Sequence, residues 1–191
     1  MGIRMPFRNS PHEYGAMTQS MHWVTAALVV LAWLLGTFGD SLPHGAARMA
    51  GLFVHISAGL AIIILIVLRL AWRLSDPPPP PEPTQFGHWQ DIAARLIHAA
   101  LYGLLIVIPA VGVLLQFARG DSLPIFGITD IASPWQQDRV FARSLKEIHE
   151  TLANLLMIVA GLHAAAALVH HWLLRDRTLS RMLPGGTRSY R

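Results

Sequence analysis

Four long stretches without charged residues divide the chain. No Asp, Glu, Lys or Arg occurs in residues 14–39, 49–68, 96–118 or 151–174, and each stretch is rich in Leu, Ile, Val and Ala. A helix needs about 20 such residues to cross the hydrocarbon core of a membrane. The pattern therefore predicts an all-α membrane protein, with four transmembrane helices over approximately 16-39, 48-74, 89-118 and 144-175 in a single domain covering 1-191.

The basic residues in the connections predict the orientation of these helices. Cytoplasmic connections of membrane proteins carry an excess of Lys and Arg. Placing the N-terminus inside puts ten arginines on the cytoplasmic side: Arg4, Arg8, Arg69, Arg73, Arg95, Arg175, Arg177, Arg181, Arg188 and Arg191. The outer side then has Arg48, Arg119, Arg139, Arg143 and Lys146. We therefore expect both termini to be cytoplasmic.

The connections differ in character. Residues 77–83 are rich in proline, which predicts an extended, semi-rigid inner linker. Residues 120–143 form a longer outer connection, and only this one has room for a small structured lid. We find no internal repeat in the sequence and no second, soluble domain.

Composition agrees with a lipid environment and excludes several kinds of site. The chain is 53% hydrophobic and 14% charged, whereas soluble domains carry about 25% charged residues. It contains no cysteine, which excludes disulfides, thiolate zinc sites, iron–sulfur clusters and thiol nucleophiles. Most basic residues flank hydrophobic segments, so they indicate membrane topology and not a nucleic-acid partner.

Histidines within the predicted helices carry the chemistry. His149 and His163 are fourteen residues apart, which is almost four helical turns, so both rings lie on nearly one face about 21 Å apart along the axis. By its depth in the membrane, His55 matches His149 near the outer side and His22 matches His163 near the inner side. Two facing imidazoles fit a six-coordinate haem iron, which transfers electrons and does not bind oxygen.

Other residues leave alternatives open. His98 lies near the inner level and could replace His22 or His163 as a ligand, line a quinone pocket, or simply hydrogen-bond to a neighbouring helix. His170 and His171, at the inner end of the last helix, favour an interfacial polar role over iron ligation, and His170 is a second candidate donor to a quinone. Three glycines near the histidines fit either close approach of a porphyrin or ordinary helix packing: Gly36, Gly59 and Gly112. The sequence from His149 to Ala153 lacks the second histidine of the metalloprotease pattern.

Several motifs resemble one known family. The most specific are Ser144-Leu145-Lys146 with the following run from His149 to Asn154, the run from Gly161 to Leu168, and the pair His170-His171. With Val54-His55, Gly59, Pro109 and Gly112, these motifs resemble the bacterial cytochrome b561 family of small inner-membrane di-haem proteins. The resemblance runs from about Met21 to Pro184.

The resemblance implies a function as well as a fold. It implies two b haems, one held by His22 with His163 and one by His55 with His149, in a four-helix bundle of the bacterial inner membrane. It also implies oxidation of superoxide at the periplasmic face and reduction of ubiquinone in the membrane, with a protein partner not required. Arg143 and Lys146, which flank His149, are the candidates for attracting the superoxide anion. The alternative is a cytochrome b subunit that passes electrons from a partner dehydrogenase or hydrogenase to quinone.

Overall fold

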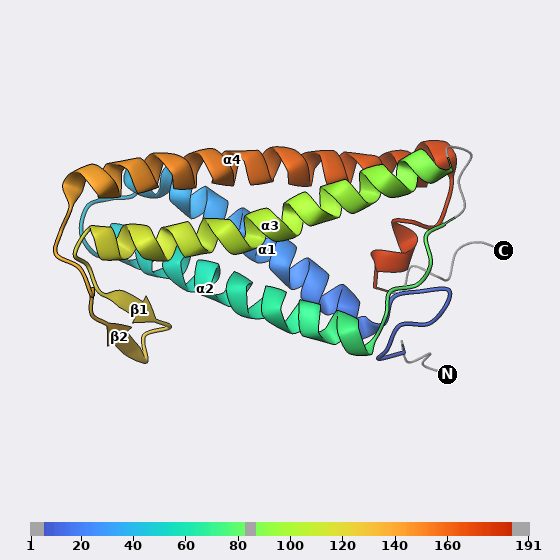
Figure 1. The fold of residues 1–191 in the computed structure, drawn as a ribbon, viewed down its shortest axis with the longest axis horizontal. Coiled ribbons are helices and arrows are strands. Elements are labelled where there is room, and N and C mark those ends of the chain that lie inside the picture. The colour runs from blue at the N-terminus through green and yellow to red at the C-terminus, as the bar shows by residue number, and fades with distance from the viewer. Residues whose placement is uncertain (1–5, 83–86, 185–191) are drawn as a thin grey trace. The chain divides into compact units, whose positions relative to one another are not determined.

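The computed structural model describes residues 6–82 and 87–184. Four helices in these ranges are long and apolar enough to cross a membrane, as the sequence predicted. They are α1 (Ala16–Phe38), α2 (Ala46–Ser75), α3 (His88–Ala118) and α4 (Arg139–Val169) (Figure 1). Among the residues used to predict orientation and the linker, Arg4, Pro83, Arg188 and Arg191 lie outside the described ranges.

The helices carry large apolar side chains on their exposed faces. Val30, Val67, Leu96 and Ile158 are between 46% and 66% exposed. In a soluble protein such surfaces would mark a binding site, but on helices of this length they are the faces that contact lipid. The all-α membrane fold expected from the sequence is confirmed.

The start of α4 differs from the expected position. The helix begins at Arg139, five residues before the predicted position 144, because Asp138 caps it. One carboxylate oxygen of Asp138 accepts hydrogen bonds from the backbone N–H groups of Val140 (3.0 Å) and Phe141 (2.9 Å). The charge-free pattern missed residues 139–143 because Arg139 and Arg143 lie among them.

The end of α4 also has a feature that the sequence did not reveal. After Val169 the helix widens into a π-helical turn, His170–Leu174, and Arg175 then takes a left-handed conformation with φ 55°. A second short helical turn, Ser180–Met182, follows. A widened turn of this kind inside a helix is often found at functional sites.

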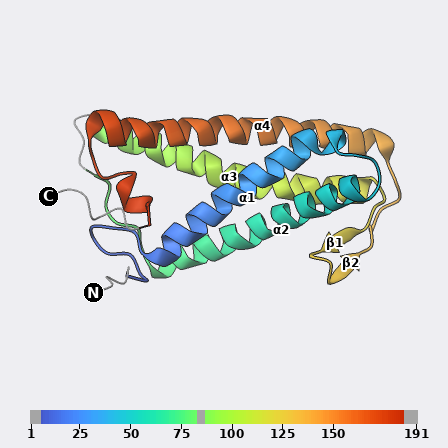
Figure 2. The same ribbon diagram turned by 180° about the vertical axis from the view of Figure 1, so that it is seen from behind.

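The predicted small structured element in the outer connection is a β-hairpin. Strands β1 (Leu123–Ile125) and β2 (Thr129–Ile131) pair antiparallel, with Leu123 opposite Ile131. Gly127, in the turn, has φ 72°, and a side chain there would approach the ring of Phe53 on α2 at 3.5 Å. Figure 2, the view from behind, shows the β-hairpin next to the first part of α2.

The described chain forms two compact units, and each helix contributes to both. One unit contains residues 25–66 and 102–157, which we call the outer unit because it includes the predicted outer connections. Its buried apolar cluster joins α3 to α4 through Leu115, Ala118, Ala142 and Leu145. The outer unit also contains the β-hairpin.

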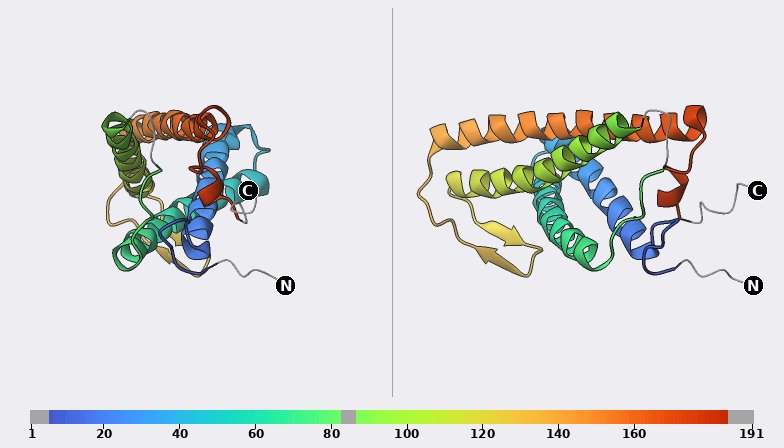
Figure 3. Two further views of the ribbon diagram at one scale, coloured as in Figure 1. Left: turned by 90° about the vertical axis from the view of Figure 1, so that its right-hand side faces the viewer. Right: turned by 45° about the vertical axis from the view of Figure 1, so that its right-hand side comes forward.

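The other unit contains residues up to 24, 67–101 and from 158 onward, and we call it the inner unit. Here the segment after α4 folds back toward the start of α1 (Figure 3). The indole N–H of Trp23 donates to the carbonyl of Met182 (2.7 Å), and the amide of Gln19 donates to the carbonyl of Arg181 (3.0 Å). Arg181 is itself buried and forms an ion pair with Glu82 (2.7 Å).

Candidate functional site

The outer unit brings His55 of α2 and His149 of α4 face to face. Their ring centroids are 6.0 Å apart, the rings are inclined by 71°, and both side chains are half-buried. An imidazole nitrogen lies about 1 Å from its ring centre and forms metal bonds of about 2.0–2.1 Å, so two rings on opposite sides of one metal have centres roughly 6 Å apart. The spacing of this pair fits a shared iron with two axial imidazoles.

A backbone carbonyl orients each of these two rings. Nδ1 of His55 donates to the carbonyl oxygen of Ala32 (2.8 Å), and Nδ1 of His149 donates to that of Ile108 (3.0 Å). Because a carbonyl can only accept, Nδ1 must carry the proton in both rings, which leaves the Nε2 lone pair available to a metal. The two candidate ligands are therefore held in the tautomer that ligation requires.

Two of the candidate glycines make this arrangement possible. Gly36 lies four residues after Ala32 and Gly112 four residues after Ile108, one helical turn along the same face. A Cβ atom at Gly36 would lie 3.1 Å from Cε1 of His55, and one at Gly112 would lie 3.1 Å from Cε1 of His149. The absent side chains let each ring reach its carbonyl, a role that sequence reasoning did not consider.

The third candidate glycine has different surroundings. A Cβ atom at Gly59 would lie 3.9 Å from Cβ of Pro109, an ordinary packing distance. Pro109 lies inside α3, where its missing N–H interrupts the helical hydrogen bonding. Gly59 thus permits close packing of α2 on the proline-containing part of α3.

The inner unit brings three histidines together. The ring centroids of His22 and His163 are 6.3 Å apart, whereas those of His98 and His163 are 5.3 Å apart. The first distance matches two imidazole rings bound to one metal, and the second is too short for two rings on opposite sides of a metal. His98 is also exposed, while His22 and His163 are half-buried. The geometry favours His22 with His163 as the inner pair and places His98 beside it.

Arg69 of α2 belongs to the same cluster. Its guanidinium interacts electrostatically with all three rings, His22, His98 and His163. A cation inside a membrane-spanning helix is costly and usually has a functional role. Sequence reasoning used Arg69 only to predict orientation and missed its place beside the inner histidines.

Site positions recur at fixed offsets, a repeat that sequence inspection did not find. His98, Ile108 and Gly112 on α3 each lie 76 residues after a counterpart on α1: His22, Ala32 and Gly36. His149 and His163 on α4 lie 94 residues after His55 and Arg69 on α2. The helical hairpin of α1 and α2 and that of α3 and α4 thus present equivalent groups to the outer site. At the inner site, however, the counterpart of His163 is Arg69.

A charged cavity lies next to the outer histidine pair. It has a volume of about 440 Å³, and four of its lining side chains are cationic: Arg119, Arg139, Arg143 and Lys146. Glu147 and Glu150 line it as well, and Glu150 forms an exposed ion pair with Lys146 (3.4 Å). Both residues proposed from the sequence to attract an anion, Arg143 and Lys146, therefore open onto one cavity that has more positive than negative groups.

Comparison with known proteins now identifies the family. A family model described as prokaryotic cytochrome b561 matches residues 13–185. The chain belongs to this family. It is 34% identical over 176 residues to a probable superoxide oxidase, CybB, of Yersinia pestis, covering 90% of this chain and 96% of the relative. It is 31% identical over 192 residues to cytochrome b561 homolog 2 of Escherichia coli K12, covering 97% and 99%.

Membership establishes the general activity. This prokaryotic cytochrome b561 is a multi-pass bacterial membrane protein with b-type haem, and it transfers electrons as an oxidoreductase. Its own residues fit a haem, because the spaced imidazoles, the ordered Nδ1 protons and the glycine-lined approach are what an iron with two axial histidines needs.

Some residues around the candidate sites gave no signal in the sequence. The carbonyls of Ala32 and Ile108 are backbone groups of residues with apolar side chains. Only the equal spacing of each residue to a following glycine could have indicated them. Asp176, whose carboxylate contacts Nδ1 of His170 at 2.5 Å, was hidden beyond the last apolar stretch. In this cytochrome b561, His170 itself lies on the π-helical turn and lines a separate cavity with Trp89 of α3.

Proposed function

We propose that the protein is a di-haem superoxide:ubiquinone oxidoreductase. In this proposal His55 and His149 hold an outer haem, His22 and His163 hold an inner haem, and superoxide gives its electron at the outer end. The charged cavity beside His149 is the observation that carries the choice of superoxide. A relative named probable superoxide oxidase, 34% identical over nearly its whole length, supports it.

The cavity has the chemistry that a small anion needs. Its four cationic side chains outnumber its two carboxylates, and a concave site with excess positive charge raises the local concentration of anions. Lys146 precedes His149 by about one turn of α4. An anion bound at Lys146 therefore lies close to the proposed outer haem ligand. Oxidation of superoxide to dioxygen releases one electron and no proton, so this cavity needs no acid or base.

The bound haems would supply reversible one-electron transfer, and the protein would supply their ligands and orientation. The carbonyls of Ala32 and Ile108 hold the outer imidazoles, and the hydrogen bonds make both rings better donors to a metal. The Arg69 cation beside the inner pair favours the reduced state of a group bound there, because added negative charge is stabilised by a nearby positive one.

The orientation and the second substrate also belong to the proposal. The excess of arginines on the inner connections supports cytoplasmic termini and a periplasmic charged cavity. Ubiquinone is the electron acceptor, dissolved in the membrane, and two histidines could hydrogen-bond to it. His98 is exposed next to His163, and His170 lines a cavity with Trp89 and Gln90.

The decisive experiment gives superoxide to the isolated protein. The haem-loaded chain, purified alone in lipid nanodiscs, is mixed with enzymatically generated superoxide and a short-chain ubiquinone, and haem reduction and quinol formation are followed optically. We expect about two haems per chain, reduction by superoxide, and one quinol for every two superoxide anions consumed. Two haems that superoxide leaves oxidised would favour the subunit function instead, with electrons delivered by a partner protein.

A further inference from the structure

The tip of the β-hairpin exposes apolar side chains in a connection that the sequence analysis predicted to be periplasmic. Ile128 is 83% exposed, Ile131 is 49% exposed and Phe126 is 39% exposed. Residues 120–138, which contain the hairpin, include no Lys or Arg. Exposed apolar groups without nearby cations indicate an apolar partner and not an anionic one.

The backbone of the hairpin tip is strained. The N–H of Ile128 donates to the carbonyl of Ile125 (2.9 Å), and the two residues between them, Phe126 and Gly127, have φ 51° and 72°. A turn with two left-handed residues usually has Asn or Asp before the glycine, because a bulky side chain is unfavourable in that conformation. Strain of this kind persists mainly at functional positions, which indicates a role for the Phe126 side chain beyond shaping the turn.

The tip packs on α2 below the outer end of that helix. A Cβ atom at Gly127 would lie 3.5 Å from Cζ of Phe53, so the hairpin backbone contacts this ring. Phe53 lies four residues into the charge-free stretch 49–68, which is just long enough to span the hydrocarbon core, because that takes about 20 residues. With a rise of about 1.5 Å per residue, Phe53 lies about 6 Å inside the outer boundary of the core. The hairpin therefore meets α2 at the depth of the lipid acyl chains.

The apolar tip continues the lipid-facing surface of α2. Met49, Leu52 and Phe53 are 68%, 45% and 38% exposed, and exposed faces of this kind on the four long helices contact lipid. The turn of the hairpin points back along the helices and not away from them (Figure 1). The tip and the first part of α2 thus form one apolar surface.

Polar residues limit how deeply the hairpin can enter lipid. Thr129 and Asp130 directly follow the tip and are exposed, and a charged group is costly in the hydrocarbon core. Elements that lie in the membrane interface bury their apolar groups about 5–10 Å into the boundary between headgroups and acyl chains. The depth of Phe53 falls within this range, so shallow insertion of the tip alone fits both observations.

We propose that Phe126 and Ile128 insert into the outer leaflet of the bilayer, so that the hairpin is a shallow lipid anchor for the connection between α3 and α4. The occupant of this apolar surface is the acyl-chain region just below the headgroups. The connection runs on to Gln137 and Arg139, which line the charged cavity, so the anchor fixes that rim of the cavity relative to the membrane. The inference is independent of the electron donor, because it concerns the connection and not the haem sites.

A periplasmic protein is the competing occupant of the tip. An exposed apolar hairpin can bind another protein as well as lipid. The contact between Gly127 and Phe53 favours lipid, because it places the tip at a depth of α2 that a protein dissolved in the periplasm does not reach.

The test makes use of the fact that the chain contains no cysteine, so one fluorophore can be attached at a chosen position. A nitrobenzoxadiazole label is coupled to Ile128→Cys of the haem-loaded protein in phosphatidylcholine nanodiscs. Its emission is measured with lipids brominated near the headgroup end of the acyl chain, with lipids brominated near the chain terminus, and with iodide in the water. Gln136→Cys, an exposed position in the same connection, is the matched control. Ile106→Cys, 46% exposed near the middle of the charge-free stretch 96–118, calibrates a deep position.

We expect the label at position 128 to lose more emission with bromine near the headgroup end than with bromine near the chain terminus, and to be protected from iodide. The label at position 136 should be quenched by iodide and by neither brominated lipid, whereas the label at position 106 should be quenched most by bromine near the chain terminus. Adding Phe126→Ser to Ile128→Cys should weaken the quenching by bromine near the headgroup end, because it removes the second apolar group of the tip. The visible spectrum of the haems verifies that each variant is folded.

Three results would overturn the lipid anchor. Quenching by iodide at position 128, without quenching by brominated lipid, would place the tip in water and leave it for a partner protein. Protection from both quenchers would show that protein covers the tip. Equal quenching by brominated lipid at positions 128 and 136 would show that the label itself enters the membrane.

Discussion

His55 and His149 face each other with ring centroids 6.0 Å apart, and each donates its Nδ1 proton to a carbonyl on the preceding helix of its own hairpin. Neither helix of a hairpin could build half of this site alone. One helix provides the ring, and the other provides the carbonyl and a glycine that leaves space for the ring. The outer site therefore depends on packing within each hairpin as well as on the two histidines.

The histidine pairs predict which haem each substitution removes. We expect His55→Ala and His149→Ala each to lower the haem content from about two to about one per chain, because an iron with one axial imidazole is held less tightly. His22→Ala and His163→Ala should remove the other haem, which gives a different residual spectrum. Pyridine haemochrome analysis and low-temperature spectra measure both effects.

Two further histidines serve as controls for these losses. His44→Ala, at an exposed position in the connection between α1 and α2, should keep both haems. His98→Ala should also keep both, since the 5.3 Å separation of its ring from that of His163 does not suit a shared metal. Loss of the inner haem in His98→Ala, with retention in His22→Ala, would assign the inner ligand to His98 instead.

The space that Gly112 leaves beside His149 predicts that one added methyl group strongly affects the outer haem. In Gly112→Ala the new Cβ would lie 3.1 Å from Cε1 of His149, so the ring must shift away from the carbonyl of Ile108. We expect reduced occupancy of the outer haem and an altered electron paramagnetic resonance signal for the remaining fraction. Gly103→Ala, on the same helix but with open space around the position, should leave both haems unchanged and stabilise α3 by up to about 1 kcal/mol. Equal effects of the two substitutions would refute the role of the gap.

The charged cavity predicts that the reaction rate with superoxide depends on the sign of the charges that line it. The double variant Arg143→Gln/Lys146→Gln should lower kcat/KM for superoxide roughly tenfold at low ionic strength, because it removes two of four cationic groups. Its rate should also depend less on added salt. Glu147→Gln, in the same cavity, should have the opposite effect and raise kcat/KM. If both variants change the rate in the same direction, electrostatic attraction is not what these residues provide.

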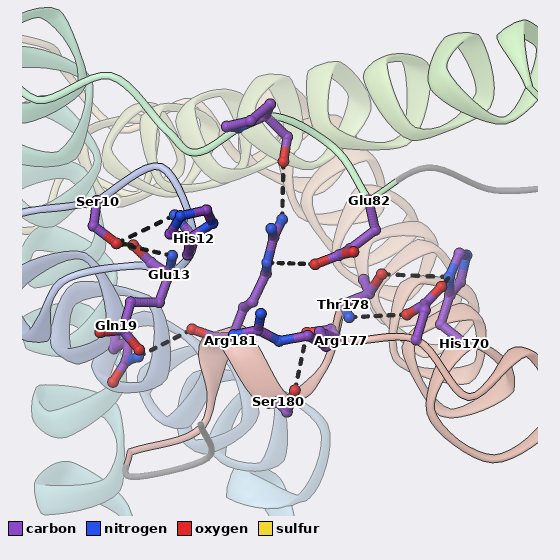
Figure 4. Close-up of polar contacts among 12 residues, drawn as sticks. Ser10, His12, Glu13, Gln19, Glu82, His170, Arg177, Thr178, Ser180 and Arg181 are labelled. Atoms are coloured by element: carbon purple, nitrogen blue, oxygen red, sulfur yellow. Dashed lines mark hydrogen bonds and ion pairs between the residues drawn. The ribbon is translucent and has the colours of Figure 1, made fainter. Parts of the chain in front are cut away.

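The ion pair between Arg181 and Glu82 predicts a stability effect in the inner unit. The two side chains are 10% and 18% exposed, and Arg181 also donates to the carbonyl of Pro80 (2.9 Å); Figure 4 shows Glu82 next to Arg181. Glu82→Ala leaves the Arg181 cation buried without its partner, which costs about 3 kcal/mol. We expect the apparent melting temperature to fall by several degrees in differential scanning fluorimetry. Glu150→Ala, which breaks the exposed pair with Lys146, should change it little.

The sequence predicted the helices and the histidine pairs for identifiable physical reasons. Lipid requires long apolar stretches, so the charge-free windows located all four helices, and the positions of the histidines along them indicated which rings could meet. The start of α4 was missed because its first five residues include two arginines, Arg139 and Arg143. That turn is set by the Asp138 cap, a local signal that the search for apolar stretches ignored.

The parts that the sequence did not reveal depend on backbone groups and on contacts distant along the chain. The carbonyls of Ala32 and Ile108 have no side-chain signature, and the Asp176–His170 contact depends on a π-helical turn that no periodicity predicts. Glu82 lies in a linker expected only to be extended, yet it pairs with Arg181, 99 positions later. Such pairings become visible only when the chain is folded.

The equal offsets between the two hairpins bear on how such a protein could have arisen. Consider two identical copies of one helical hairpin, each with a histidine on its second helix and, on its first helix, a backbone carbonyl followed one turn later by a glycine. These copies would form the complete outer histidine pair when they associate about a twofold axis. In the present chain the inner pair lacks this symmetry, because the position of His163 in one hairpin is occupied by Arg69 in the other. An ancestral dimer of this kind would have had a symmetric outer site, and divergence of the copies after gene fusion would account for the asymmetry of the inner site.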